Sequence, residues 1–315
     1  MTPDLPSVVC PVDFSEASRS ALSYAAVIAT HFGARLTVLT VDDPLLAEAA
    51  KASGFAPSVA SETEAELRRF CRETLAPFAS GPERVEFRVA VGKPATEILR
   101  WARLVSADLM VMSSHGRSGM RRRFFGSTTE RVLRETTVPV LIPPGHAAPA
   151  TSLSDIARRV HRVIAPVDLM GAPPAHLRIA GGIAQALSVP LIVAHVVEPV
   201  FIPYNVRIAV PRLDAARRTA VDEQLAQLTA GLGEIRAESL VLTGEPSEEI
   251  VKLAEARQAN LIVMGLHSAG CAGPRMGSVT YRVLCLTGAL VLAVPPRVAA
   301  SGSAATHAAQ ATVEA

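Results

Sequence analysis

The feature that most constrains the fold of this chain is an internal repeat. Six short blocks of the first half recur in the second half, in the same order and at an offset of about 152 residues. The paired blocks are Val8–Asp13 with Arg162–Asp168, Arg35–Asp42 with Leu191–Val197, Val91–Ile98 with Thr243–Ile250, Asp108–His115 with Asn260–His267, Gly126–Leu133 with Gly277–Leu284, and Pro139–Pro144 with Leu290–Pro296. A repeat of this length is one structural unit present twice, and 315 residues suit two domains of about 150 residues each.

Each copy alternates between short apolar runs and segments of helical periodicity. In the first half, the runs that predict strands are Ser7–Asp13, Arg35–Asp42, Val85–Val91, Leu109–Met112 and Val138–Ile142. Helices are predicted over 16–32, 62–78 and 97–105 and from 127 onwards, and residues 43–61 are predicted to be a connection. The predicted fold class is therefore α/β, with two tandem, doubly wound, open parallel sheets of Rossmann-like type.

Composition marks the linker and the tail. We expect a first domain over residues 1–145, a linker rich in Pro, Ala and Ser over 146–160, and a second domain over 161–297. Residues 298–315 are rich in Ala and Ser, show no periodicity and are expected to be disordered.

Charge and cysteine usage argue against several classes of protein. The formal net charge of +2 argues against a general nucleic-acid or anionic-membrane surface. The four cysteines are scattered without a CxxC pair, which favours a reducing compartment over a zinc site or a disulfide framework. The first residues lack a signal-peptide pattern, and no apolar run approaches the roughly eighteen residues that a membrane span needs. We therefore expect a cytoplasmic protein.

The stretch with the most chemical information is Leu109–Leu133. It opens as an apolar run, breaks into Ser113-Ser-His-Gly-Arg-Ser-Gly119 and closes with Gly126-Ser-Thr-Thr-Glu130. The closing segment predicts a helix start capped by Ser127 or Thr128. A strand, a glycine-containing loop and a helix N-terminus together present backbone N–H groups and a positive dipole end to an anion. The stretch therefore predicts a phosphate-binding site.

This stretch resembles the nucleotide-binding signature of the ATP-binding universal stress proteins. That signature is Gly, two residues, Gly, nine residues, Gly, and then Ser or Thr. Here Ser113 takes the place of the first glycine, Gly116 follows at the right spacing, and Gly126 and Ser127 come after nine further residues. The flanking segments Asp108–Met112 and Glu130–Leu133 are also similar to the corresponding segments of that family. The blocks agree in order and spacing, so the resemblance is specific.

The resemblance implies an adenine nucleotide as ligand: ATP, or ADP or AMP, with or without Mg. The residues that match the family's base and ribose contacts are Pro11, Val12, Asp13, Val41 and Met112, and those that match its phosphate contacts are Ser113, Gly116, Gly126, Ser127 and Thr128. Asp13, Val41 and the loop after Met112 each follow a predicted strand, so a parallel sheet brings them to one edge. Taken alone, Asp13 is equally compatible with a turn or helix-cap role, and the glycines with ordinary turns.

The loop carries further candidates. Arg117 belongs to a basic cluster with Arg121–Arg123. A solvated face accounts for most of that cluster, while one or two members would neutralise phosphate charge. His115 is either a phosphate donor or a structural residue of a polar loop.

The second copy departs from the signature. Gly265 keeps the first glycine, but Ser268 replaces the second, and only eight residues separate it from Gly277 and Ser278. A missing residue in a phosphate-binding loop shifts several N–H groups. We therefore expect one working site per chain, in the first half.

We expect a tandem universal stress protein in which the nucleotide is a conformational ligand that biases assembly or the binding of a stress-pathway protein. By resemblance, the final strands Pro139–Ile142 and Leu290–Val294 pair the two halves, and whole chains can also dimerise through them. No P-loop and no nucleophile triad is present, so enzymatic activity beyond slow ATP hydrolysis is not expected. Two alternatives stay open: an interaction scaffold that binds no nucleotide, which Ser113 and the altered second copy favour, and a slow ATPase switch, which needs a metal ligand besides Asp13.

Overall fold

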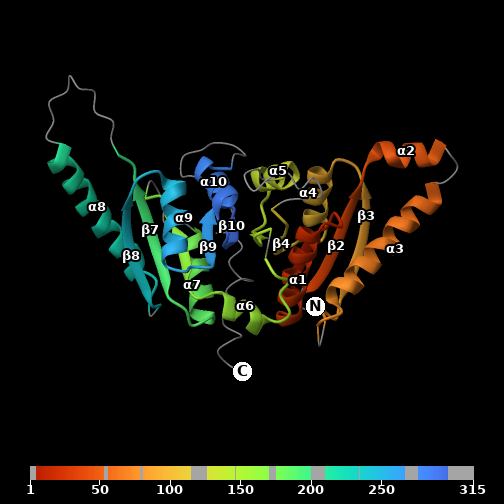
Figure 1. Cartoon of the computed structure of the whole chain (residues 1–315), viewed down its shortest axis with the longest axis horizontal. Helices are drawn as coiled ribbons and strands as arrows, with labels where there is room; N and C mark the ends of the chain where they lie inside the picture. Colours follow the sequence, from red (N-terminus) through yellow and green to blue (C-terminus); the bar gives the residue numbers. More distant parts are fainter. Residues whose placement is uncertain are drawn as a thin grey trace, which may run out of the picture.

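The computed structural model describes residues 5–52, 56–78, 81–114, 126–145, 147–169, 175–199, 210–233, 235–266 and 276–296. Its strands form one ten-stranded sheet in the order β3-β2-β1-β4-β5-β10-β9-β6-β7-β8 (Figure 1). The strands are β1 (Ser7–Pro11), β2 (Arg35–Asp42), β3 (Val85–Val91), β4 (Leu109–Val111), β5 (Val140–Ile142), β6 (Val163–Pro166), β7 (Leu191–Val197), β8 (Ala237–Thr243), β9 (Leu261–Gly265) and β10 (Leu290–Val294). The helices are α1 (Glu16–His31), α2 (Pro44–Ala52), α3 (Ala56–Leu75), α4 (Pro94–Leu104), α5 (Ser127–Glu135), α6 (Leu153–Arg159), α7 (Ala175–Ala186), α8 (Val210–Ala230), α9 (Pro246–Ala256) and α10 (Ser278–Leu286).

Each half contributes five neighbouring strands to this sheet. Within each half every strand pairing is parallel, and helices connect the strands. This is the doubly wound, Rossmann-like arrangement that the alternating pattern predicts. All residues of β1 and of β10 are buried, because helices cover both faces of a parallel sheet, and such strands are therefore continuously apolar in sequence.

The two halves meet in the middle of the sheet. There β5 and β10 run antiparallel, with Leu141 opposite Leu292. The strands that were expected to pair the halves thus lie side by side, and the two copies form a pseudo-dimer. However, β5 also pairs with β4, and β10 also pairs with β9. A homodimer through the same two strands therefore has no free strand edge to use.

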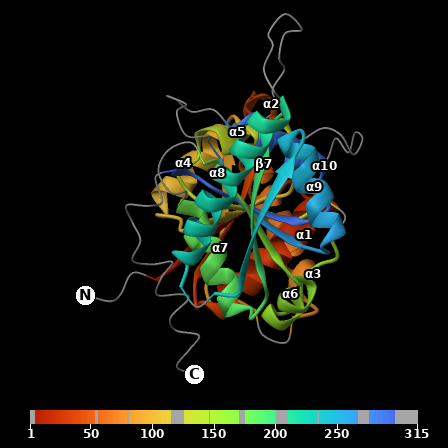
Figure 2. The ribbon, with the colours of Figure 1, turned by 90° about the vertical axis from the view of Figure 1, so that its left-hand side faces the viewer.

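Helices cover both faces of the sheet, and each face has its own core (Figure 2). One core includes Leu22 of α1, Leu67 of α3 and Leu225 of α8. The other includes Ile98 of α4, Leu133 of α5 and Val283 of α10. Equivalent helices of the two halves thus pack into the same core, and α5 and α10 lie on either side of the centre of the sheet (Figure 1).

Several element boundaries differ from those that the sequence predicts. The connection predicted over 43–61 is helical, because α2 occupies Pro44–Ala52 and α3 already begins at Ala56. The described side chains of α2 are exposed, Leu45 at 74%, so no buried apolar stripe among them reveals the helical periodicity. The first, fourth and fifth strands are also shorter than predicted, since β1 ends at Pro11, β4 ends at Val111 and β5 begins at Val140.

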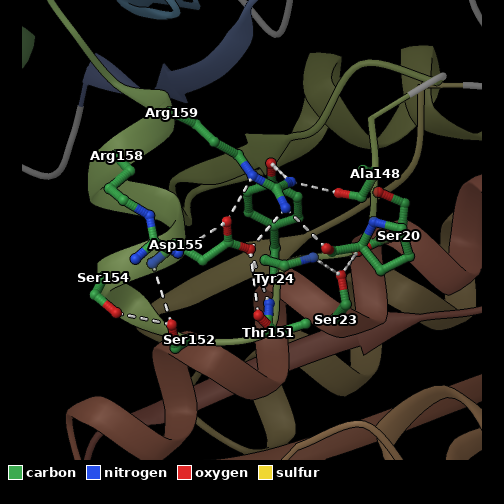
Figure 3. Close-up of polar contacts among 12 residues, drawn as sticks. Ser20, Ser23, Tyr24, Ala148, Thr151, Ser152, Ser154, Asp155, Arg158 and Arg159 are labelled. Carbon is green, nitrogen blue, oxygen red and sulfur yellow. Dashed lines mark hydrogen bonds and ion pairs between the residues drawn. The ribbon is translucent and has the colours of Figure 1, made fainter.

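The segment between the halves is held against helix α1 (Figure 3). The expected linker contains a helix, α6, whose N-cap Ser152 accepts a hydrogen bond from the N–H of Asp155 at 3.1 Å. Ahead of this helix, the buried N–H of Ala150 donates to the hydroxyl oxygen of Ser23 on α1 at 2.8 Å. This bond connects residues that are 127 positions apart.

Arg159 at the end of α6 completes the attachment. Its guanidinium donates to the carbonyl oxygens of Ala148 at 2.6 Å and Pro149 at 3.0 Å, and it pairs with Asp155 at 2.6 Å (Figure 3). We call Ser23, residues 148–151, Asp155 and Arg159 the linker clasp. The clasp fixes the connection to the first half before the chain enters β6.

Candidate functional site

The carboxyl ends of β1 and β4 form the topological switch point of the first half. Strand β1 pairs with β2 on one side and with β4 on the other, and ligands of open α/β sheets bind beyond the carboxyl ends of such strands. Asp13 follows β1 and Ser113 follows β4. Val41 lies near the end of β2, next to β1. The structure therefore brings these three predicted residues to one edge of the sheet.

The predicted base and ribose residues differ in exposure. Val12 is 5% exposed and Met112 is 4% exposed, and their side chains belong to the two opposite cores. Pro11 is buried as well, whereas Asp13 and Val41 are half-buried. We therefore expect Pro11, Val12 and Met112 to meet a ligand through their backbone, and Asp13 and Val41 through their side chains.

Asp13 is positioned by the start of helix α1. Its Oδ1 accepts hydrogen bonds from the N–H of Ser15 at 3.1 Å and from the hydroxyl of Ser15 at 2.6 Å. Ser15 is in turn the N-cap of α1 and accepts a hydrogen bond from the N–H of Ser18 at 3.1 Å. Asp13 thus has the turn role that the sequence left open, and the same bonds hold its carboxylate at the carboxyl edge.

Two hydrogen bonds connect the end of β4 to the start of α5. The N–H of Gly126 donates to the carbonyl oxygen of Ser114 at 3.0 Å. The hydroxyl of Thr129 donates to the carbonyl oxygen of Ser113, also at 3.0 Å. These bonds close the base of the loop and place the N-terminus of α5 beside the strand end. The loop residues His115, Gly116 and Arg117 lie outside the described residues.

The N-cap of α5 is Gly126, with φ −63° and ψ 131°, and no side chain caps the helix. The prediction that Ser127 or Thr128 is the cap is therefore wrong, because Ser127 is already the first helical residue. The N–H groups of the first turn have no partner within the helix. A glycine at the N-cap adds no side chain of its own in front of them.

The described residues contain neither a candidate metal site nor a candidate membrane span. Among them, no three His, Cys, Asp or Glu side chains are grouped so as to hold a metal ion. No helix in the described ranges is both long enough and apolar enough to cross a membrane.

Comparison with known proteins decides the family. The model of the universal stress protein family matches this chain twice, over residues 6–144 and 159–295. The chain belongs to the universal stress protein family.

Relatives within this family match one half of the chain. A universal stress protein of Methanocaldococcus jannaschii is 28% identical over 135 residues, which are 43% of this chain and 79% of that protein. The Bacillus subtilis protein YxiE is 28% identical over 138 residues, 42% of this chain and 93% of that protein. Each relative is thus a single copy of the unit that this chain contains twice.

Two solved structures share the whole tandem fold. A functionally unknown protein from Pseudomonas aeruginosa has a TM-score of 0.61 at 15% identity and covers 99% of this chain and 98% of its own. A universal stress protein from Archaeoglobus fulgidus has a TM-score of 0.58 at 19% identity and covers 92% of this chain and 98% of its own. At these identities the likeness shows the fold alone.

The second family unit closes its loop in the same way as the first. The N–H of Gly277 donates to the carbonyl oxygen of Leu266 at 2.8 Å. The hydroxyl of Thr280 donates to the carbonyl oxygen of Gly265 at 2.9 Å. Ten residues lie between Leu266 and Gly277, against eleven between the equivalent Ser114 and Gly126. The second loop is thus one residue shorter between the same two anchoring bonds.

The sequence analysis missed the two anchoring threonines. Thr129 is 6% exposed and Thr280 is 4% exposed, and both hydroxyls hold the carbonyl at the end of the preceding strand. The repeat contained a signal, because Thr129 and Thr280 occupy the same position of the two Gly-Ser blocks. A hydroxyl kept at a buried position of both copies indicates a shared hydrogen bond.

Proposed function

We propose that this chain binds ATP or a related adenine nucleotide at the carboxyl edge of its first half. The nucleotide acts as a conformational ligand that biases the binding of a stress-pathway protein. The observation that carries this proposal is the N-cap of α5, where Gly126 is followed by helical residues and no side chain caps the helix.

The backbone conformation at position 126 does not explain why this residue is glycine. Its φ of −63° and ψ of 131° are open to any residue. Ser, Thr, Asp or Asn would satisfy a free N–H at an N-cap, and helices prefer them there. A glycine at the N-cap that does not adopt a left-handed conformation and has no side chain to bond the free N–H groups supports a role in leaving room, and phosphate oxygens are the ligands that helix N-termini attract.

The neighbouring residues fit the other parts of an adenine nucleotide. Asp13 is a carboxylate at the adjacent strand end, held by Ser15, and it can accept hydrogen bonds from ribose hydroxyls or the adenine amino group. Ser127 and Thr128 supply N–H groups and hydroxyls to phosphate. Gly116, His115 and Arg117 belong to this site through the motif spacing. If Mg accompanies the nucleotide, it would be held mainly by the phosphates.

The first test is the nucleotide content of the purified protein and its calorimetric titration with ATP. We expect about one nucleotide per chain. The decisive variant is Gly126→Asp, which places a carboxylate at the phosphate position while providing a better helix cap. It should abolish ATP binding and leave the unfolding free energy equal to that of the wild type or higher by about 0.3–1 kcal/mol.

The matched control is Gly277→Asp, because Gly277 is the N-cap of α10 with φ −58° and also lacks a side-chain cap. This variant should bind ATP like the wild type. If the wild-type chain contains no nucleotide and ATP produces neither heat nor a melting shift, the nucleotide proposal fails, and the chain is an interaction scaffold of the same fold.

A further inference from the structure

A glycine corner precedes helix α4 in the first half and helix α9 in the second. Gly92 and Gly244 have φ values of 155° and 147°. A Cβ at these positions would lie 3.0 Å from the Cγ of Glu97 and 2.7 Å from the Cγ of Glu249, respectively. Both corners therefore require glycine and share one geometry. They differ in the next residue, which is Lys93 in the first half and Glu245 in the second.

In the second half this corner carries two carboxylates beside α10. Glu245 caps α9 by accepting a hydrogen bond from the N–H of Glu248 at 2.9 Å, and Ser247 donates its hydroxyl to the same carboxylate at 2.6 Å. Arg282 of α10 pairs with Glu245 at 3.0 Å and with Glu248 at 3.5 Å. We call Glu245, Glu248 and Arg282 the acidic clamp. Partial burial opposes ionisation of Glu245, but the hydrogen bonds and Arg282 lower its pKa overall.

In the first half the positions of the two carboxylates carry a positive and a neutral side chain. Lys93 is the N-cap of α4, is exposed and makes no side-chain cap bond. Thr96 stands where the second half has Glu248. Arg131 stands where the second half has Arg282, and it pairs instead with Glu135 of its own helix at 3.2 Å. One ammonium group in the first half thus replaces two carboxylates in the second.

The acidic clamp also shows how near this corner lies to the start of the neighbouring helix. Arg282 is only four residues after Ser278, the first residue of α10, and its side chain reaches the first turn of α9. The same spacing holds between Ser127 and Arg131 in α5, which packs against α4. If the first-half corner has the same arrangement, Lys93 at the N-cap of α4 lies beside the first turns of α5, where its charge would act through space on an anion at the start of that helix.

From this comparison we infer that Lys93 determines specificity for phosphate charge at the first-half site. The acidic clamp has carboxylates at the corresponding corner of the second half, and they disfavour phosphate at the start of α10. The inference rests on the proposed function. A positive charge near the start of α5 favours ATP over ADP and AMP, because the attraction grows with the number of phosphate charges and weakens as salt screens it. The ligand class that the site selects is therefore a nucleoside triphosphate.

The test transfers the second-half corner to the first half. Affinities for ATP, ADP and AMP are measured by calorimetry at low salt and at high salt for the wild type, Lys93→Glu and the double variant Lys93→Glu/Thr96→Glu. We expect Lys93→Glu to weaken ATP binding about three- to tenfold at low salt and AMP binding less, the double variant to weaken ATP binding further, and both effects to shrink at high salt. Lys93→Arg should behave like the wild type.

A control separates charge at this corner from charge in general. Lys252→Glu makes the same change in charge at an exposed position of α9, in the second half, and should leave the ATP-to-AMP affinity ratio unchanged. If the wild type binds ATP but Lys93→Glu and the double variant keep its ATP-to-AMP ratio, the inference is overturned while the proposed function stands. If the wild type binds none of the three nucleotides, the proposed function itself fails.

Discussion

Thr129 donates its hydroxyl to the carbonyl oxygen of Ser113 at 3.0 Å, and in the second half Thr280 makes the same bond to Gly265 at 2.9 Å. The bond fixes the first turn of α5 against the end of β4. We expect Thr129→Val to lower the unfolding free energy by about 0.5–1.5 kcal/mol, because a buried hydrogen bond is lost. ATP affinity should fall about three- to tenfold, since the start of α5 is no longer held in place.

Two variants check this prediction by calorimetry and urea denaturation. Thr129→Ser keeps the hydroxyl and should restore most of the affinity. Thr280→Val removes the equivalent bond from the second half, so it should reduce stability by a similar amount without changing ATP affinity. Equal losses of affinity in Thr129→Val and Thr280→Val would contradict a site confined to the first half.

The sheet was predictable from the sequence because its strands are buried. Strands such as β1 and β10 have no exposed residue, so they stand out as apolar runs in both copies of the repeat. The pairing of β5 with β10 was expected from the family resemblance rather than from the residues, and the structure shows that it is antiparallel. Helix α2 was missed because its described side chains are exposed and form no buried apolar stripe.

The candidate site was predictable only in part. Asp13, Val41 and Ser113 were expected at one edge because parallel strands share a carboxyl edge, and the structure places them there. The cap of α5 was assigned to a side chain because propensity favours Ser and Thr, whereas Gly126 is the N-cap and Ser127 is already the first helical residue. The linker clasp depends on a contact between Ser23 and Ala150, which are far apart in sequence, and such a contact leaves no local pattern.

The linker clasp predicts different outcomes for two buried serines on the same helix. Ser23 is 0% exposed and accepts the N–H of Ala150, which is also 0% exposed. Ser23→Ala leaves that N–H buried without an acceptor, and we expect it to lower the unfolding free energy by about 1–3 kcal/mol.

Ser20 provides the matched control for this prediction. It is 3% exposed, and its hydroxyl has no hydrogen-bond partner among the described residues. Ser20→Ala should therefore leave the unfolding free energy unchanged or raise it by about 1 kcal/mol, because it removes a buried hydroxyl that has no partner. Urea denaturation measures the unfolding free energy of both variants. Equal losses of unfolding free energy would show that the bond between Ser23 and Ala150 does not stabilise the fold.

His176 predicts a pH dependence of stability. Its Nε2 lies 2.7 Å from the carbonyl oxygen of Pro166, so the nitrogen donates, and the side chain is 7% exposed. Burial lowers the pKa of His176, although the bond to the carbonyl favours the charged form. In the unfolded chain His176 therefore takes up a proton at about pH 6.5, while in the folded chain this side chain is still neutral at that pH. The unfolding free energy should consequently fall as the pH decreases below about 6.5.

The variant that tests this is His176→Gln, which keeps a side-chain N–H and does not titrate. Urea denaturation between pH 5 and pH 8 should give a smaller loss of stability on acidification for the variant than for the wild type. The two proteins should follow parallel curves above pH 7.5, where histidine is neutral in both states. An identical loss below pH 6.5 would assign the acid sensitivity to other groups.

Ser113 predicts how strictly the site depends on the first glycine of the motif. The described non-glycine residues with positive φ are Phe14, Ser106, Ser188 and Gln258, so Ser113 adopts a backbone conformation open to any residue. Glycine is therefore not required there by the chain itself. We expect Ser113→Gly to leave ATP affinity within about twofold of the wild type and to lower the unfolding free energy by about 0.4–1 kcal/mol, because glycine gains freedom in the unfolded chain.

A bulkier variant completes the test of Ser113. Ser113→Val should weaken ATP binding, because a branched side chain takes more room than serine at a position where the family motif has glycine. Calorimetry with ATP and urea denaturation on the three proteins separate affinity from stability. An increase in ATP affinity of tenfold or more in Ser113→Gly would instead show that the serine side chain crowds the nucleotide and that this copy of the site is already weakened.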